Sequence, residues 1–346
     1  MLETFNIDMR PTVLLVDGAH TLRRSQFQES LRGLSNSVGM PTGAIFGFFN
    51  SLRAAINSMS ASSVVVTWEG GHSLRRKQVY EQYKYREREE EPKRDIHGYT
   101  DYEYYVHQLS WIKKILECLG VPQVQVEGKE GDDVLFQASR LLQGRKIIIS
   151  EDRDFYALIS DDVSIYRPIK KLYIDKGNFT EVSNYLTPLH YLYGKVLAGD
   201  PSDNIPSVAQ GVGEKTILSV LNNIPDPKDL SPTLILQEAA RIGGKRFMKL
   251  ASVGEEPIIR NLDLIDISRE KFDVFQLQSM SDGLSTQRYP NVALANKLFN
   301  ILEFSPENTR GLISKLSMMS EYPLSTLIDK TYIKRSLLGE TSIFEG

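Results

Sequence analysis

The chain has 346 residues, of which 41% are hydrophobic and 25% are charged, a composition typical of a globular protein. Its 41 basic and 44 acidic side chains give a formal net charge of −3, so the overall charge does not point to a nucleic-acid partner. No uncharged segment approaches the roughly 20 residues of a membrane-spanning helix. The single cysteine, Cys118, excludes an internal disulfide and a thiolate zinc site. We therefore expect a protein of a reducing compartment, the cytoplasm, with no membrane partner.

The first half of the chain alternates between short apolar runs and helical patterns. The runs that suit buried strands are residues 12–16, 63–68, 123–126 and 145–150. The helical patterns are residues 43–59, 102–119 and 134–142. This alternation predicts an α/β fold with a central, mostly parallel sheet flanked by helices. After about residue 185 the pattern changes to helices and loops, so we expect an α/β core over 1–185 and a mainly helical region over 186–346.

Acidic residues gather where the predicted strands end. Asp17, Glu69, Asp152 and Asp154 each stand at or just after the carboxyl end of an apolar run. Because the carboxyl ends of parallel strands share one edge of a sheet, we expect these acids to lie in one region. The other acids of the set are Glu130, Asp132, Asp133, Asp200 and Asp203. Oxygen-only ligands select Mg²⁺ or Mn²⁺, and two such ions about 4 Å apart are the usual clamp for phosphodiester hydrolysis.

The motifs occur in the order seen in one known family. They are Asp17-Gly18, Glu130-Gly131-Asp132-Asp133, Asp152-Arg153-Asp154-Phe155-Tyr156, the segment Gly199 to Pro206, and Gly211-Val212-Gly213-Glu214-Lys215-Thr216. Together they resemble the structure-specific 5′ nucleases, which include flap endonucleases and the 5′ nuclease domain of bacterial DNA polymerase I. The later segment Asn261 to Asp266 is most similar to the phage replication RNase H branch. The resemblance implies a PIN-like core.

The resemblance also implies roles for the acids. Those that would hold or adjoin the first metal are Asp17, Glu69, Glu130 and Asp132, and the second group is Asp152, Asp154 and Asp203. Asp133 and Asp200 would order waters or ligands. The family usually has Asp where Glu69 stands, so Glu69 would coordinate either directly or through water. The alternative for Asp133 is an acid at a helix N-terminus that interacts with the helix dipole.

The segment from Leu74 to Arg88 is basic and aromatic. Its cations are Arg75, Arg76, Lys77, Lys84, Arg86 and Arg88, and Tyr80, Tyr83 and Tyr85 are interleaved. Cations beside stacking rings are typical of a single-strand channel, and the alternative is a solvated helix face with its tyrosines on the core. By resemblance, Lys84 and an arginine steer the scissile phosphate, but the family spacing falls on Glu87, which leaves Arg86 or Arg88 as that arginine. The DNA contacts expected here are Arg75, Arg76, Lys77 and Tyr83.

The same resemblance places a helical arch at about residues 72–110. Residues 87–100 are charged and poor in apolar side chains, so we expect the part from 88 to 100 to be mobile until DNA orders it.

A glycine-rich hairpin follows the last acids. Gly211 and Gly213 allow close backbone approach, and the following helix start, with Lys215 and Thr216, presents N–H groups to a phosphate. By resemblance this is a helix-hairpin-helix motif at about 196–222 that holds duplex DNA, often with a bound K⁺. The final segment Ser342 to Gly346 either binds a sliding clamp or a single-strand-binding protein, or packs on the core.

These features predict a monomeric hydrolase with two Mg²⁺ ions, for which Mn²⁺ can substitute. It would act as a 5′-3′ exonuclease or flap endonuclease, with RNase H-like activity on RNA–DNA hybrid, and remove 5′ flaps and RNA primers from Okazaki fragments. The host would be a bacterium or a phage-infected cell. Two alternatives remain at this point: a catalytically silent protein that binds branched DNA, and a single-strand ribonuclease on a related fold.

Overall fold

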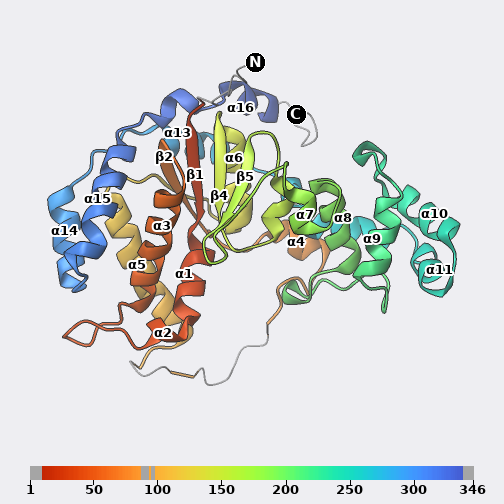
Figure 1. The fold of residues 1–346 in the computed structure, drawn as a ribbon, viewed down its shortest axis with the longest axis horizontal. Helices are drawn as coiled ribbons and strands as arrows, with labels where there is room; N and C mark the ends of the chain where they lie inside the picture. Colours follow the sequence, from red (N-terminus) through yellow and green to blue (C-terminus); the bar gives the residue numbers. More distant parts are fainter. Residues whose placement is uncertain (1–9, 87–92, 95–97, 338–346) are drawn as a thin grey trace, which may run out of the picture.

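The structure is a computed structural model that describes residues 10–86, 93–94 and 98–337 (Figure 1). The strands of its sheet are β1 (Thr12–Asp17), β2 (Ser63–Trp68), β3 (Gln123–Gln125), β4 (Arg145–Ile149), β5 (Val163–Arg167) and β6 (Leu172–Ile174). The helices up to the end of the sheet region are α1 (Gly18–Phe27), α2 (Glu29–Arg32), α3 (Gly43–Ser58), α4 (Leu74–Val79), α5 (Asp101–Cys118), α6 (Gly131–Leu141) and α7 (Phe179–Ser183). The later helices are α8 (Pro188–Ala198), α9 (Glu214–Asn222), α10 (Pro232–Ile242), α11 (Lys245–Ala251), α12 (Glu256–Ile265), α13 (Val274–Ser285), α14 (Val292–Ile301), α15 (Pro306–Ser320) and α16 (Lys330–Leu337).

The sheet has the strand order β3-β2-β1-β4-β5-β6. Every neighbouring pair is parallel except β5 and β6, which are antiparallel. Strand β1 is central: Val13 lies opposite Ser63 of β2 and Lys146 of β4. All residues of β1 are buried. Because β1, β2 and β4 run in the same direction, the residues that follow them meet at one edge of the sheet.

Two hydrophobic cores lie on the two faces of this sheet. Leu14 and Val16 of β1 belong to one core, and Val13 and Leu15 to the other, since successive side chains of a strand point to opposite faces. The first core is closed by α3 and α5 and by α14 and α15 outside them, as Figure 1 shows. The second core contains α6 and continues into α8, α9 and α10.

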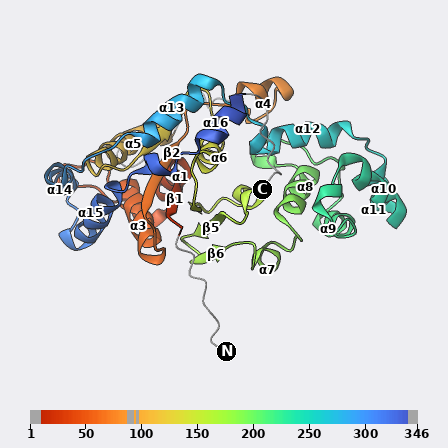
Figure 2. The same cartoon turned by 90° about the horizontal axis from the view of Figure 1, so that it is seen from above.

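The later helices form two groups. Helices α8 to α12 extend away from the sheet, on the right in Figures 1 and 2. Helices α13 to α16 return to the sheet region, where α13 contacts β3, α15 contacts β2, α14 contacts α5 and α16 contacts α6. The described part of the region expected over 186–346, which ends at residue 337, is mainly helical, and its last helices pack against the α/β core. The division of the chain at residue 185 stays a prediction.

The predicted elements correspond closely to the observed ones. The α/β class with a mostly parallel sheet is confirmed, and each predicted strand and helix has an observed counterpart. Strands β5 and β6 were not expected. Strand β5 ends in Arg167, a charged residue in a buried position. Its Nε donates to Glu151 at 3.1 Å, and its Nη1 donates to the Tyr156 hydroxyl oxygen at 3.0 Å. These bonds satisfy the guanidinium in a largely buried position.

None of the helices in the described ranges combines the length and the apolar character needed to cross a bilayer.

Candidate active site

Aspartates meet at the carboxyl edge of the sheet. Asp17 is the last residue of β1 and is only 3% exposed. One of its oxygens caps α1 by accepting the His20 backbone N–H at 3.0 Å, and the other accepts the Ser150 hydroxyl at 3.1 Å. The Ser150 oxygen in turn accepts the backbone N–H of Asp152, also at 3.1 Å. Ser150 therefore links the ends of β1 and β4, as parallel pairing predicts for these two strands.

Burial and neighbouring acids raise the pKa of three aspartates at this edge. Burial and the charges of Asp17 and Asp152 raise the pKa of Asp132, in the first turn of α6, well above its ordinary value. Burial and Asp152 also raise the pKa of Asp17, and the same two causes raise that of Asp154 to about 6. The direction of these shifts indicates that carboxylates at the ends of β1 and β4 and at the start of α6 lie close together, and that the nearby Lys84, Lys195 and His20 do not offset burial and repulsion.

Glu130 is the centre of a hydrogen-bond cluster just before α6. One of its oxygens accepts from the Tyr83 hydroxyl at 2.8 Å, the Lys84 ammonium at 2.8 Å and Arg76 Nη1 at 3.3 Å. Its other oxygen accepts the Ser73 backbone N–H at 3.3 Å. Burial opposes ionisation of Glu130, but Lys84 and Arg76 outweigh it and lower its pKa. Glu130 is therefore held as an ionised, positioned carboxylate.

Asp133 and Arg76 form a buried ion pair. Arg76 Nη1 lies 2.7 Å from one oxygen of Asp133 and Nη2 lies 2.7 Å from the other. Asp133 is 0% exposed and Arg76 is 1% exposed. Arg76 Nε also donates to the Leu264 carbonyl at 2.9 Å, and the pairing with Asp133 raises the pKa of Arg76 against its burial. These placements do not fit the expected contact of Arg76 with DNA, and they give Asp133 a cation other than a metal ion.

Tyr83 is also buried, at 2% exposure, where DNA contact was expected. Its ring packs with Ile205 and Leu264 in a small core, and its hydroxyl is held by Glu130. For Tyr83, the structure therefore favours the alternative interpretation of this segment, in which the tyrosines pack on the core, over a contact with DNA.

Lys195 is a site residue that the sequence reasoning missed. Its ammonium pairs with Asp154 and lies 3.1 Å from Asp200, and 22% of its side chain is exposed. Burial opposes the charge of Lys195, but Asp154 and Asp200 raise its pKa. In the sequence, Lys195 stands five residues before Asp200, at the end of an apolar helical segment. A single lysine in such a segment does not by itself indicate a functional site.

The turn from Asp200 to Ile205 is tied to the segment before the expected arch. The Lys84 backbone N–H donates to the Asp203 carbonyl at 2.9 Å, and the Asn204 side chain donates to the carbonyls of Gln82 and Tyr85. Lys84 Nζ also lies 3.7 Å from an Asp203 carboxylate oxygen. Lys84 has a φ of +49°, a conformation that non-glycine residues seldom adopt. The bonds to the turn hold it, and they place the ammonium between Glu130 and Asp203.

The donor chemistry of this edge fits divalent cations. In the described part of the chain, Asp17, Asp132 and Asp152 have no ion pair with a lysine or arginine, whereas Lys84 and Lys195 take up oxygens of the other acids. In residues 10–86, 93–94 and 98–337, no three Asp, Glu, His or Cys side chains are grouped closely enough to hold an ion as they stand. Added positive charge would nevertheless favour the ionised form of these mutually repelling carboxylates, and oxygen ligands select hard ions.

The remaining predicted residues lie farther out. Glu69 follows β2, and its side chain is 44% exposed and 3.8 Å from the His72 ring. Arg75 is partly buried and pairs with Glu270 at 3.0 Å. Lys77 is half-buried and Arg86 is exposed. Arg88 lies outside the described residues, as do residues 87–92 and 95–97 of the expected arch, so the predicted mobility there stays a prediction.

The glycine hairpin connects α8 and α9, which pack together. Gly211 has a φ of +78°, and Gly213 stands immediately before α9. Lys215 is exposed, as expected for a phosphate contact, but Thr216 is buried at 6% exposure, and its backbone N–H bonds to the Gly213 carbonyl. The hairpin can therefore present Lys215 and the glycine backbone, but not the Thr216 side chain.

The fold and the carboxylate edge define a class of nuclease. Residues 12–184 match the family model of the 5′-3′ exonuclease, N-terminal resolvase-like domain. The chain belongs to this family.

The curated proteins that the chain resembles in sequence include bacterial DNA polymerases I. The chain is 35% identical over 212 residues to the thermostable DNA polymerase I of Thermus thermophilus, which covers 60% of this chain and 24% of that protein. It is 27% identical over 304 residues to DNA polymerase I of Mycobacterium tuberculosis, which covers 85% of this chain and 31% of that protein. The chain thus corresponds to less than a third of the length of either relative.

Solved structures show the same fold. The bacteriophage T5 flap endonuclease, in a complex with DNA and metal ions, has a TM-score of 0.58 and 20% identity and covers 85% of this chain and 100% of that one. The T5 5′-exonuclease with bound zinc has a TM-score of 0.57 and 19% identity, over 88% and 99% of the two chains. The overall fold is therefore shared with these T5 structures.

Proposed function

We propose that this protein is a metal-dependent 5′ nuclease that hydrolyses phosphodiesters of 5′ flaps and of RNA primers in duplex DNA during Okazaki fragment processing. The observation that carries the proposal is the group of aspartates Asp17, Asp132 and Asp152 at the carboxyl edge of the sheet, where burial and neighbouring acids raise the pKa of Asp17 and of Asp132. Such a group is stable in its ionised form only beside added positive charge. Membership of the 5′-3′ exonuclease family supports the reaction class.

The residues divide between two groups that would hold two Mg²⁺ ions, with Mn²⁺ as a substitute. The first group is Asp17, Glu130 and Asp132, with Glu69 farther out and acting through water. The second group is Asp152, Asp154 and Asp203, with Asp200 beside it. When bound, the ions supply an activated water and neutralise charge on the scissile phosphate and the leaving oxygen.

The chain's own cations complete the site. Lys84 lies between Glu130 and Asp203 and can turn its ammonium to the scissile phosphate when the carboxylates are neutralised. Arg86 is exposed two residues farther along and offers a second, bidentate phosphate contact. Lys195 holds Asp154 and Asp200 together, and it balances their charge in the metal-free protein. Preorganised cations of this kind stabilise the charge that develops on the transferred phosphate.

We assign duplex binding to the α8–α9 hairpin as a helix-hairpin-helix motif. Gly211 and Gly213 permit the close approach of a phosphate, Lys215 adds a cation, and K⁺ would join the backbone carbonyls to the phosphate. The binding partners would be nicked or branched DNA and RNA–DNA hybrid, held by a monomer. The segment Ser342 to Gly346, expected to bind a clamp or a single-strand-binding protein, lies outside the described residues.

The test uses the full chain with two 5′-labelled substrates, a 5′ flap and an RNA-primed duplex, each in Mg²⁺ and in EDTA. We expect cleavage only with Mg²⁺, and its loss in Asp152→Asn. Asp161→Asn, at a surface ion pair with Lys176, is the matched control and should cleave as the wild type does. Failure of the wild type to cleave either substrate with Mg²⁺ would overturn the nuclease assignment. Salt-sensitive DNA binding without cleavage would favour a junction-binding protein.

A further inference from the structure

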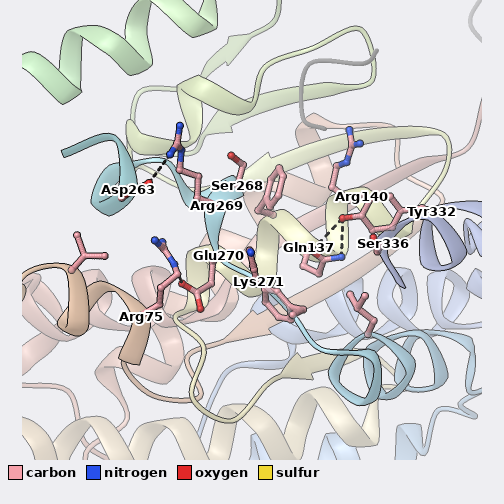
Figure 3. A pocket seen from close by; sticks show the side chains of 14 residues that line it. Arg75, Gln137, Arg140, Asp263, Ser268, Arg269, Glu270, Lys271, Tyr332 and Ser336 are labelled. Atoms are coloured by element: carbon pink, nitrogen blue, oxygen red, sulfur yellow. Dashed lines mark hydrogen bonds and ion pairs between the residues drawn. The ribbon is translucent and has the colours of Figure 1, made fainter. Parts of the chain in front are cut away.

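A separate cavity of about 630 Å³ opens along α6 beyond the Arg76–Asp133 pair. Phe136, Gln137 and Arg140 line it and lie three, four and seven residues after Asp133, on the same stripe of the helix. The other walls come from α4, from α12 and α13 with the segment that joins them, and from α16 (Figure 3). None of the nine acids of the candidate active site lines this cavity.

The cavity carries an excess of positive charge. Its cations are Arg75, Arg140, Arg269 and Lys271, and its acids are Asp263 and Glu270. Arg269 pairs with Asp263 at 2.5 Å, while Glu270 is shared between Arg75 at 3.0 Å and Lys129 at 2.7 Å. Within the part of the chain that the structure describes, Arg140 and Lys271 have no acidic partner. Figure 3 shows these labelled cations around one opening, so the charge faces a common space.

Arg75, which lines this cavity, has an unmet donor. Its Nε is bonded to Glu270, but its Nη2 is buried and has no hydrogen-bond partner among the described residues. A buried guanidinium N–H without an acceptor costs free energy, and a small turn of the Arg75 side chain toward the cavity would bring this donor to a bound anion.

Aromatic rings stand next to the cations. The Arg140 guanidinium lies 5.3 Å from the centre of the Tyr332 ring, and the Tyr332 hydroxyl is fixed by Gln137 at 3.0 Å. Phe272 also lines the cavity, and Lys129 lies 5.1 Å from the centre of its ring. Fixed rings beside guanidinium groups suit a flat aromatic ligand, because both offer stacking surfaces.

We propose that this cavity binds a nucleoside 5′-phosphate. The phosphate pairs with Arg75 and Lys271, and the base stacks at the end formed by Tyr332 and Arg140. The volume lies within the range of about 300–1,000 Å³ that is usual for small-molecule sites. The ligand is either a free nucleotide or the 5′-phosphorylated end of a strand, which share this chemistry. The site goes beyond the proposed nuclease and uses no residue of its carboxylate edge.

The test is calorimetric titration of the full chain in EDTA, so that no metal ion recruits phosphate to the aspartates. The probes are dAMP, inorganic phosphate, deoxyadenosine and a 5′-phosphorylated trinucleotide. We expect saturable binding of dAMP, with phosphate and deoxyadenosine each at least about tenfold weaker. A trinucleotide that binds more tightly than dAMP would support the site and identify a strand end as the ligand.

Variants locate the binding. Lys271 is exposed, so Lys271→Gln is expected to fold normally and to weaken dAMP binding about tenfold. Tyr332→Leu should weaken dAMP and leave phosphate unchanged. Lys334→Gln, an exposed lysine on the same helix α16 and outside the cavity lining, is the matched control. The proposal is overturned if wild type binds no dAMP, if phosphate binds as tightly as dAMP, or if Lys271→Gln and Lys334→Gln bind dAMP equally. These experiments measure ligand binding and not flap cleavage, so their failure can be distinguished from failure of the proposed nuclease function.

Discussion

Arg76 and Asp133 form a bidentate ion pair in which both guanidinium–carboxylate distances are 2.7 Å and neither residue is more than 1% exposed. The pair joins α4 to the first turn of α6, next to Asp132 and Glu130. The two adjacent acids are therefore in different surroundings. Asp133 forms an ion pair with Arg76. Asp132 has no such ion pair within the described residues, and the charges of Asp17 and Asp152 raise its pKa while Lys84 lowers it. This contrast leads to the first two predictions.

Breaking the Arg76–Asp133 pair should destabilise the fold. Arg76→Met leaves the buried Asp133 carboxylate without its cation, and Asp133→Asn leaves Arg76 with only the 3.3 Å ion pair to Glu130. Each variant should lower the free energy of unfolding by about 3–5 kcal/mol. The double variant Arg76→Met/Asp133→Leu should recover most of this loss, because it removes both charges. Urea unfolding in EDTA measures all three. An Asp133→Asn protein of unchanged stability and weakened metal affinity would show instead that Asp133 is a metal ligand.

Asp132→Asn should have the opposite effect on the metal-free protein. Removal of one of the repelling carboxylates should raise the melting temperature in EDTA, and it should abolish most of the gain that Mg²⁺ gives the wild type. The measurement is thermal unfolding with and without Mg²⁺. Asp161→Asn, at the exposed Lys176 pair, controls for the loss of a surface charge. A destabilised Asp132→Asn in EDTA would contradict the electrostatic account of this cluster.

The stability of the protein should depend on pH in a way that metal reverses. Asp17, Asp132 and Asp154 have pKa values above their ordinary range, that of Asp154 at about 6. The folded state thus binds their protons more tightly than the unfolded state does, so in EDTA their contribution to stability falls as pH rises from about 4 through 6 and above. Metal binding requires the ionised forms, so stabilisation by Mg²⁺ should be small at pH 5 and grow toward pH 8.

Thermal unfolding over this pH range, in EDTA and in Mg²⁺, provides the comparison. Asp132→Asn should flatten the EDTA profile. A Mg²⁺ effect that is the same at pH 5 and pH 8 would argue against these three residues as its source.

Lys84→Asn should slow flap cleavage about 100-fold while DNA still binds. Asparagine tolerates the positive φ of this position, so the variant removes the ammonium between Glu130 and Asp203 without straining the turn. Single-turnover cleavage and equilibrium binding separate the two effects. Lys176→Asn, at an exposed lysine, is the control. An equal loss in binding and in cleavage would assign Lys84 to substrate affinity alone.

Lys215→Gln should weaken duplex binding uniformly across sequences. Loss of one phosphate contact should reduce the slope of log affinity against log salt by about 1. Lys170→Gln, at a lysine outside the hairpin, should leave the slope unchanged. Binding titrations over a range of salt concentrations measure the slope, and an unaltered slope in Lys215→Gln would remove the hairpin from the duplex contact.

Much of the fold and part of the site followed from the sequence alone. The strands β1, β2 and β4 are continuous apolar runs, because both of their faces are buried, and the acids after them are brought together by parallel pairing. The edge that joins Asp17 to Asp152 was therefore predictable from local pattern.

The tertiary structure decided which charges pair. Arg76 and Asp133 are 57 residues apart, and Lys195 and Asp154 are 41 apart, so no local pattern could show that these cations are taken up by acids. The same holds for the return of α13 to α16 onto the sheet, which depends on contacts with β2, β3, α5 and α6. The net charge of −3 conceals this sorting. A residue's type is set by the sequence, but whether its charge meets another chain segment, a metal ion or a phosphate depends on packing between distant segments.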